Sequence, residues 1–254
     1  MIRDSLTAKD ILYQDDYLLV LNKPAAVPIH GSRMLEGRPQ TLLAMAREQT
    51  GRMVHAVHRL DRPVSGAVML TFDKNTLTEM SAEFENRHVG KSYLAVARGW
   101  TKEEGIIDYP LLPPRDERRG DEQAREATTR FKRLAKTELP IEIPPYQTAR
   151  YSLLQLVPET GRRHQLRRHM KHISHHLVGD TTYGRGEHNR LFREHFACKR
   201  LLLHSHSLTF HHPRSGEKMK AIAPLDTAFD RVLEIFGGTN DTGPLTDPTD
   251  LSGA

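Results

Sequence analysis

The chain has 254 residues, of which 37% are hydrophobic and 27% are charged, and its net charge is +5. With the 17 glycines added, the apolar fraction is near that of globular proteins, which excludes a mostly disordered chain. The single cysteine, Cys198, excludes an internal disulfide and a cysteine pair for metal or redox chemistry. The polar N-terminus and the absence of an apolar run near about 18 residues predict neither a secretory signal nor a membrane span. We therefore expect a cytoplasmic protein.

Apolar patterning predicts strands with few helices between them. In chain order, the expected elements are two strands joined by a polar turn over 11–22, a helix over 40–50, a loop over 58–66, a strand over 67–72, a helix over 75–87 and a strand over 91–100. They continue with strands over 127–135 and 150–157 around a Pro-rich turn at 140–145, a helix over 162–172, and a strand pair or one long strand over 200–212. This order favours a mixed α+β fold, with a largely antiparallel central sheet of about eight strands flanked by helices and loops.

Two segments differ from the rest in composition. The stretch 113–126 is charged throughout with both signs, which is typical of a solvated loop or hairpin. Residues 237–254 hold three Asp and no Lys or Arg among many Gly, Thr and Pro, and this composition predicts a disordered tail. We expect one folded domain over 1–236 followed by that tail.

The strongest charge feature is the segment GRRHQLRRHMK at 161–171, which contains five Arg or Lys and no acidic residue. On a helix, Arg163, Arg167 and Met170 would share one side. Such a face is either simply solvated or binds RNA phosphates through its guanidinium groups, with one Arg directed inward.

The segment HRLDRPVSG at 58–66 places Asp61 between Arg59 and Arg62, in a loop that leads into a buried strand. Two nearby cations favour the ionised carboxylate. An ionised carboxylate in a basic cleft can act as a nucleophile. An Arg–Asp pair that only pins the loop is the alternative.

Histidines cluster at 164–176 and 204–212, which raises the possibility of a metal site. These clusters lack a nearby Cys and a Glu-x-x-His arrangement, so we expect no metal. A metal-dependent hydrolase would be the competing class, and activity that survives excess chelator would exclude it.

HRLDRPVSG, followed by an apolar strand, resembles the signature loop of the pseudouridine synthases, in the branch typified by RluA. Further segments resemble the family's other motifs in the same order: LNKPAAVPIH at 21–30, KSYLAV at 91–96, ETGRRHQLRRHM at 159–170, VGDTTYG at 178–184 and RLLLHSHSL at 200–208. The resemblance covers about residues 11–225. It implies the pseudouridine synthase catalytic fold and an RNA-modifying isomerase that needs no cofactor.

Within this branch, the chain is most similar to short members that lack an S4-type RNA-binding domain and modify a uridine at tRNA position 65, in the T-stem. The resemblance implies RNA, most often tRNA, as partner. The same chemistry on rRNA or another tRNA stem is the alternative. A catalytically silent RNA-binding protein would lack Asp61, Tyr93 or Arg167, and all three are present. We expect a monomer, because no long apolar surface helix stands out.

The resemblance also implies a role for each of three catalytic residues. Asp61 matches the nucleophile, which would attack C1′ of the sugar or C6 of the base. Arg167 matches the Arg that pairs with this nucleophile. Tyr93 matches the ring that lies against the flipped base, and its hydroxyl would assist removal of the C5 proton.

Four further residues are expected to bind substrate. Arg59 matches the residue that enters the RNA stack where the base has left. Leu203 is expected to line the base pocket, with Leu201 as an alternative. Arg62 is expected to shape the loop or to contact phosphate, and Arg163 is expected to contact phosphate.

Overall fold

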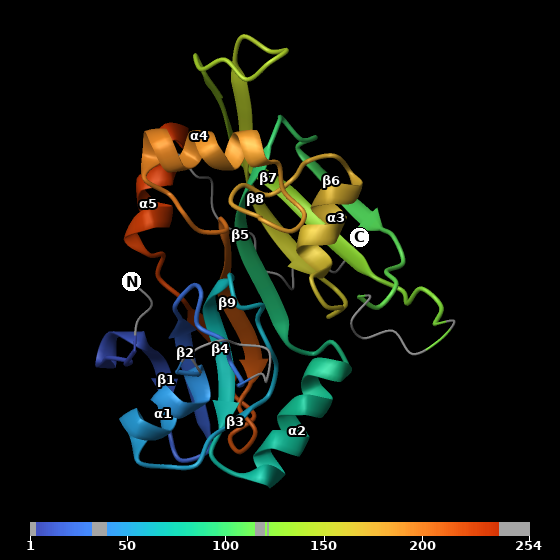
Figure 1. The fold of residues 1–254 in the computed structure, drawn as a ribbon. Helices are drawn as coiled ribbons and strands as arrows, with labels where there is room; N and C mark the ends of the chain where they lie inside the picture. Colours follow the sequence, from blue (N-terminus) through green and yellow to red (C-terminus); the bar gives the residue numbers. More distant parts are fainter. Residues whose placement is uncertain (1–3, 32–39, 115–119, 121, 239–254) are drawn as a thin grey trace. The chain divides into compact units, whose positions relative to one another are not determined.

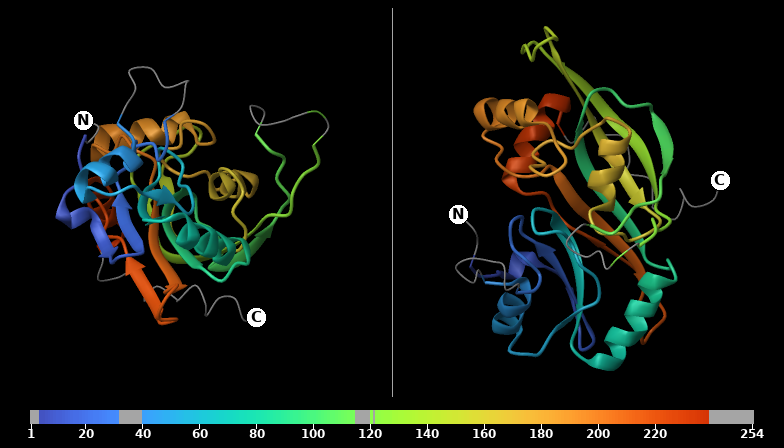
Figure 2. Two further views of the ribbon diagram at one scale, coloured as in Figure 1. Left: turned by 90° about the horizontal axis from the view of Figure 1, so that it is seen from below. Right: turned by 45° about the vertical axis from the view of Figure 1, so that its right-hand side comes forward.

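The computed structural model describes residues 4–31, 40–114, 120 and 122–238. The predicted tail lies outside the described residues from 239 onward, as do 115–119 and 121 of the charged segment 113–126. The chain forms two compact units (Figures 1 and 2). Unit 1 comprises Met1–Lys91 and His204–Leu225, and unit 2 comprises Ser92–Leu203 and Asp226–Ala254. The single catalytic domain expected over 1–236 stays a prediction.

Unit 1 is built on strands that are mostly antiparallel. Its described strands are β1 (Ile11–Gln14), β2 (Leu18–Lys23), β3 (His55–Ala56), β4 (Ser65–Thr71), β9 (Leu203–His211, in this unit from His204) and β10 (Lys218–Ile222). They pair in the order β1-β2-β4-β9-β10, with β3 also on β4, and only β4 and β9 run parallel among these pairs of described strands. Its helical elements are η1 (Ala8–Asp10), α1 (Leu42–Thr50) and α2 (Lys74–Glu85).

The core of unit 1 forms where α2 packs on the sheet. Alternating residues of β2 and β4, such as Val20 and Met69, are fully buried there with Met80 of α2 and Phe210 of β9. Asp73 accepts a hydrogen bond from the N–H of Thr76 and so caps α2 at its start.

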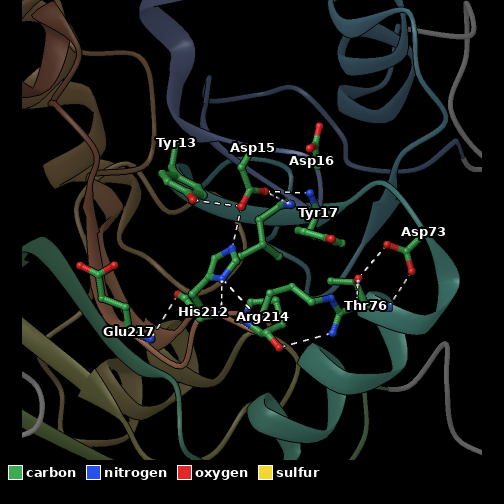
Figure 3. A network of polar contacts seen from close by, with 12 residues as sticks. Tyr13, Asp15, Asp16, Tyr17, Asp73, Thr76, His212, Arg214 and Glu217 are labelled. Atoms are coloured by element: carbon green, nitrogen blue, oxygen red, sulfur yellow. Dashed lines mark hydrogen bonds and ion pairs between the residues drawn. The ribbon is translucent and has the colours of Figure 1, made fainter.

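A polar network joins the β1–β2 turn to the β9–β10 turn (Figure 3). Asp15 accepts hydrogen bonds from the N–H groups of Tyr17 and Leu18 and from the Tyr13 hydroxyl, at 2.7–3.0 Å. The ring of His212 lies 2.6 Å from the same carboxylate through Nε2. His212 Nδ1 accepts from the N–H of Arg214 at 3.2 Å, so Nε2 carries the proton that Asp15 receives.

Unit 2 contains a four-stranded antiparallel sheet among its described residues. Its strands are β5 (Gly90–Arg98, in this unit from Ser92), β6 (Glu104–Asp108), β7 (Thr128–Leu139) and β8 (Ala149–Pro158), paired in the order β5-β8-β7-β6. Its helical elements are α3 (Gln165–His172), α4 (Gly186–Phe196), α5 (Thr227–Leu233) and η2 (Glu234–Phe236). The β7–β8 hairpin extends beyond α4 at one end of the unit (Figures 1 and 2).

The mixed α+β class with a largely antiparallel arrangement of strands is confirmed. The expected elements over 11–22, 40–50, 67–72, 75–87, 91–100, 127–135 and 150–157 are also found, with shifts of a few residues at their ends. The region 200–212 contributes one strand, β9, whose hairpin partner β10 comes later in the chain. No helix in the described residues has the length and hydropathy that crossing a membrane requires.

Several elements were missing from the expectation, among them α4, β6 and α5. Helix α4 buries His188, Leu191 and Phe192, whose i, i+3, i+4 spacing is a helical signal in the sequence itself. Strand β6 pairs only with β7 among the strands of unit 2 and buries a single residue, Ile107, so its alternating pattern is weak. Helix α5 is only seven residues long.

Candidate active site

The segment that carries Asp61 connects β3 to β4 in unit 1, and His58 anchors the start of this segment. His58 Nε2 accepts a hydrogen bond from the N–H of Met69 at 3.0 Å, and its ring stacks on Phe84 with centroids 4.5 Å apart. Burial, with a smaller effect of the Lys91 charge, lowers the pKa of His58 to about 3. The neutral imidazole is therefore a structural acceptor that holds the loop, and it is not suited to phosphate binding.

A buried ammonium holds the middle of the loop. Lys23 is 0% exposed, and its Nζ donates to the carbonyl oxygens of Pro24 and Val27 at 2.8 Å and of Arg62 at 3.2 Å. The Arg62 side chain donates through Nε to the Ala26 carbonyl at 3.0 Å. Two hydrogen bonds, one donated from each segment, thus join the Lys-Pro turn after β2 to Arg62, the loop residue that follows Asp61. Arg62 is exposed and shapes the loop; its expected phosphate contact stays a prediction.

The end of the loop is fixed where β4 begins. Ser65 and His204 are both buried, with Ser65 Oγ 2.7 Å from His204 Nδ1, and His204 Nε2 donates to the Ala223 carbonyl at 3.0 Å. At Gly66 the backbone has φ +109°, and an added Cβ would lie 2.2 Å from the Ser205 carbonyl oxygen. Only glycine fits this close approach of β4 to β9.

Asp61 therefore lies in a loop that is tied at both ends and in the middle. Its carbonyl accepts from the N–H of Val64 at 3.0 Å, which closes a turn over the two residues between them. The Asp61 residue is half-buried, and Arg59 is exposed. A partly accessible carboxylate on a rigid support is the arrangement that an attacking group requires.

In unit 2, Tyr93 lies near the start of β5 and pairs with Leu156 of β8. It is 9% exposed. Because side chains alternate along a strand, Tyr93 shares its face of the sheet with Ala95 and Ala97. Both alanines are fully buried.

Arg167 of α3 forms a buried ion pair. Its Nε and Nη2 donate to the two carboxylate oxygens of Asp180 at 2.7 and 2.9 Å, and the two side chains are 5% and 1% exposed. Asp180 also accepts from the N–H groups of Thr182 and Tyr183, each at 2.9 Å. Burial alone would raise the pKa of Asp180, but the Arg167 and backbone hydrogen bonds outweigh it and leave that pKa below its ordinary value. Asp180 is thus an anion that orients the guanidinium.

Two further residues of α3 dock the helix on β7. Gln165 donates through Nε2 to Thr128 O at 2.9 Å and Thr129 Oγ1 at 3.0 Å. His169 is 0% exposed, with Nδ1 2.9 Å from Thr129 Oγ1 and Nε2 3.1 Å from the Tyr109 carbonyl. These polar contacts set the position of Arg167 relative to the sheet of unit 2.

The placement of Arg163 on a face of this helix was wrong. Helix α3 begins at Gln165 with His164 as its N-cap residue, in the left-handed region at φ 56°. Arg163 precedes the helix and does not share a helical side with Arg167 and Met170. A non-glycine residue in that conformation carries little sequence signal. The inward direction expected for one Arg is confirmed for Arg167, and the phosphate contact expected of Arg163 stays a prediction.

Leu203 is the first residue of β9 and is 2% exposed. Its carbonyl accepts from Arg200 Nη2 at 3.0 Å. Leu201 is equally buried, so exposure does not decide between the two leucines as a lining of the base pocket.

Arg59, Asp61 and Arg62 belong to unit 1, whereas Tyr93, Arg163, Arg167 and Leu203 belong to unit 2. The pairing of Asp61 with Arg167 stays a prediction. Neither Asp180, which lies within VGDTTYG, nor Lys23 was expected to have a role. Asp180 is an acidic residue that follows soon after the basic segment 161–171, and this position could have suggested it as a partner for one of the arginines. Within the described residues, no three His, Cys, Asp or Glu side chains group as metal ligands.

Comparison with known proteins places the chain among the pseudouridine synthases. The family model described as "RNA pseudouridylate synthase" matches residues 17–172, which include the loop, Tyr93 and Arg167. The chain is 42% identical over 233 residues to tRNA pseudouridine synthase C of Vibrio cholerae, covering 90% of this chain and 96% of that protein. It is 41% identical over 236 residues to tRNA pseudouridine synthase C of Haemophilus influenzae, covering 91% of this chain and 99% of that protein.

Solved structures agree with these matches. The chain is similar to human RNA pseudouridylate synthase domain containing 1, with a TM-score of 0.66 and 25% identity over 87% of this chain and 86% of that one. Human RNA pseudouridylate synthase domain containing 4 shares the fold, with a TM-score of 0.67 over 90% of this chain and 93% of that one.

Proposed function

Because the chain belongs to the RNA pseudouridylate synthase family, we propose that it converts one uridine of tRNA to pseudouridine, at tRNA position 65 in the T-stem. The substrate is supported by relatives of about 40% identity that carry the name tRNA pseudouridine synthase C and match this chain over nearly their full length. The same isomerisation on rRNA or on another tRNA stem is the second candidate. A cytoplasmic monomer belongs to the same proposal.

The observation that carries the chemistry is the anchored loop. Lys23 donates a hydrogen bond to the carbonyl of Arg62. His58 and Ser65 hold the two ends of the segment that presents Asp61. A nucleophile reacts fastest when its supporting residues hold it in place before the substrate binds. Three separate anchors around a half-buried carboxylate support Asp61 in that role.

In the proposed reaction, Asp61 attacks the flipped uridine at C1′ of the sugar or at C6 of the base. The glycosidic N1–C1′ bond breaks, the uracil turns in place, and C5 bonds to C1′. After attack at C1′, Asp61 leaves C1′ as C5 bonds to it; after attack at C6, it leaves C6 as the C5 proton is lost. Removal of the C5 proton is assisted by the Tyr93 hydroxyl, and N1 carries a proton in the product. Arg167 keeps Asp61 ionised and oriented, while Arg59 fills the gap in the RNA stack.

The test is a map of pseudouridine across tRNA and rRNA in cells that lack this protein. We expect one tRNA signal, at position 65, to disappear, and the wild-type chain to restore it. Asp61→Asn should not restore it while still binding the RNA. The exposed Asp16 of the same unit offers a matched control, since Asp16→Asn removes the same charge and should restore the signal in full.

Loss of an rRNA signal with intact tRNA would replace the proposed substrate and keep the chemistry. Turnover by pure Asp61→Asn protein would refute the assignment of the nucleophile.

A further inference from the structure

A cavity of about 640 Å³ lies in unit 2, at the end of β5 that is farther from Tyr93. Its walls come from the end of β5, the β7–β8 turn with the start of β8, the segment after α3 and the start of α4. The residues used below are Arg98, Gly99, Trp100, Tyr146, Arg150 and His188. This volume lies within the ~300–1,000 Å³ range of small-molecule sites.

The cavity is separate from the surroundings of Tyr93. Arg98 comes five positions after Tyr93 in β5, which is about 17 Å at ~3.3 Å per residue. Their side chains point to opposite faces of the strand, because their positions differ by an odd number. The catalytic role proposed for Tyr93 therefore leaves this cavity unexplained.

The wall at the end of β5 is rigid. Gly99 has φ +79°, and an added Cβ would lie 3.3 Å from His175 Nδ1. That nitrogen donates to the Arg98 carbonyl at 2.9 Å, and the Gly99 carbonyl accepts from Ser152 Oγ at 2.8 Å. The backbone that carries Arg98 and Trp100 is thus held from two sides, as a preformed site requires.

The cavity is positively charged. None of the hydrogen bonds or ion pairs among the described residues uses the guanidinium of Arg98. Arg150 uses Nε for Glu138 at 3.1 Å, and its guanidinium carbon lies 4.3 Å from the centre of the Trp100 ring. This stacking positions Arg150 while its two terminal nitrogens stay available. Two available guanidinium groups in one cavity favour an anion with several oxygens, such as a phosphate.

Two other groups of the cavity suit an uncharged, planar part of a ligand. Burial, together with the Arg98 charge, lowers the pKa of His188 to about 4, so its ring is neutral near pH 7. Tyr146 is 59% exposed in a turn closed by its mutual backbone hydrogen bonds with Ile143, at 2.9 and 2.8 Å. An exposed ring on a fixed turn is a surface on which a planar base stacks.

We propose that this cavity binds one nucleotide unit, with its base on Tyr146 and its phosphate between Arg98 and Arg150. The unit is an unstacked nucleotide of an RNA chain or a free nucleoside monophosphate, which have the same chemistry. The RNA source rests on the proposed function, whereas the free nucleotide does not.

The test compares Arg98→Gln and Tyr146→Ala with a matched control, Arg193→Gln. Arg193 is exposed on α4 and does not line the cavity, so this control removes the same charge from the same unit. The first measurement is the dissociation constant for unmodified tRNA over a range of salt concentrations. The second is calorimetric titration of the wild-type chain and each variant with AMP and with UMP.

For an RNA nucleotide, each variant weakens tRNA binding roughly tenfold, and the two differ in salt dependence. Arg98→Gln lowers the slope of log Kd against log salt by about 0.7, because one single-stranded phosphate contact is lost. Tyr146→Ala leaves the slope unchanged, because stacking releases no counterions. Arg193→Gln behaves as the wild type.

For a free nucleotide, the calorimetric binding of AMP or UMP is lost in both variants and kept in Arg193→Gln, with tRNA binding unchanged. If Arg98→Gln and Tyr146→Ala change neither the binding of tRNA nor the binding of AMP or UMP, the proposal is wrong. Pseudouridine formation by the wild-type chain in the same tRNA is measured alongside. Its absence would remove the proposed function, while the nucleotide titrations would still decide on the cavity.

Discussion

The guanidinium of Arg167 is held by the carboxylate of Asp180 through two hydrogen bonds of 2.7 and 2.9 Å, with both side chains almost fully buried. Two N–H···O bonds in parallel fix the plane of the guanidinium as well as its position. The direction of Arg167 is therefore determined inside unit 2. Asp180 is a positioning residue for an Arg to which we assign a catalytic role.

Asp180→Asn should damage both stability and turnover. The substitution removes the charge of the buried carboxylate that accepts two hydrogen bonds from Arg167, and neutralising one partner of such a pair costs about 3 kcal/mol in the free energy of unfolding. A guanidinium that is free to rotate should also lower kcat by on the order of 100-fold. Urea unfolding and single-turnover kinetics measure the two effects.

The matched control for this change is Glu159→Gln. Glu159 pairs with Arg130, but the two side chains are 28% and 21% exposed, so the loss should be below about 1 kcal/mol. An equal loss of unfolding free energy in the two variants would show that burial does not make the Arg167–Asp180 pair more stabilising than a partly exposed pair.

Arg167→Ala should lose more activity than a missing phosphate contact explains. We expect kcat to fall at saturating RNA, because a positioned charge beside the reacting groups cannot be replaced by more substrate. Arg168 is the neighbouring control, since it is partly exposed and, among the residues that the structure describes, donates only to the Leu112 carbonyl. Recovery of full activity by Arg167→Ala at high RNA concentration would reduce Arg167 to a phosphate ligand.

Arg59→Ala should affect structured RNA more than unstructured RNA. The exposed side chain is proposed to fill the gap that the flipped base leaves in a helical stem, and a single-stranded oligonucleotide has no such gap. We expect kcat/KM to fall roughly tenfold or more on a stem and to change little on an unpaired strand. A uniform decrease on both substrates would indicate a simple phosphate contact.

Asp15→Asn should destabilise the protein in a pH-dependent way. Burial of the carboxyl opposes ionisation, but hydrogen bonds from Leu18, Tyr17 and His212 outweigh burial and hold the pKa of Asp15 below its ordinary 3.8. A depressed pKa in the folded state contributes stability above the unfolded value, and that stability is lost as the pH falls through the folded value. We expect a deficit of about 2 kcal/mol at pH 7.

The difference between wild type and Asp15→Asn should therefore shrink as the pH falls below 3.8. Thermal unfolding at a series of pH values measures it. Asp16→Asn changes the adjacent residue, whose side chain is 94% exposed, and should match the wild type throughout. A deficit that does not change with pH would indicate that Asp15 acts through packing alone.

Local patterns predicted most of the elements, because alternation and turn residues act over a few neighbouring positions. The Gln14-Asp15-Asp16 turn between β1 and β2 is one such case, and the buried run of β4 is another. Helix α4 could have been found from the spacing of His188, Leu191 and Phe192. The start of α3 could not have been found in this way, because the left-handed conformation of His164 depends on its surroundings. One of these contacts is between His164 Nδ1 and Tyr183 Oη, at 3.0 Å.

By itself, the sequence determined the mixed fold class, the loop of Asp61, and the family to which its ordered motifs belong. These follow from residue types and short spacings, which a single chain displays directly. Only the tertiary structure decided which side chains support the loop and which carboxylate holds Arg167. Lys23 lies 39 positions from Arg62 in the chain, and Asp180 lies 13 positions from Arg167. Contacts across such separations form when distant segments pack together, and no local pattern encodes them.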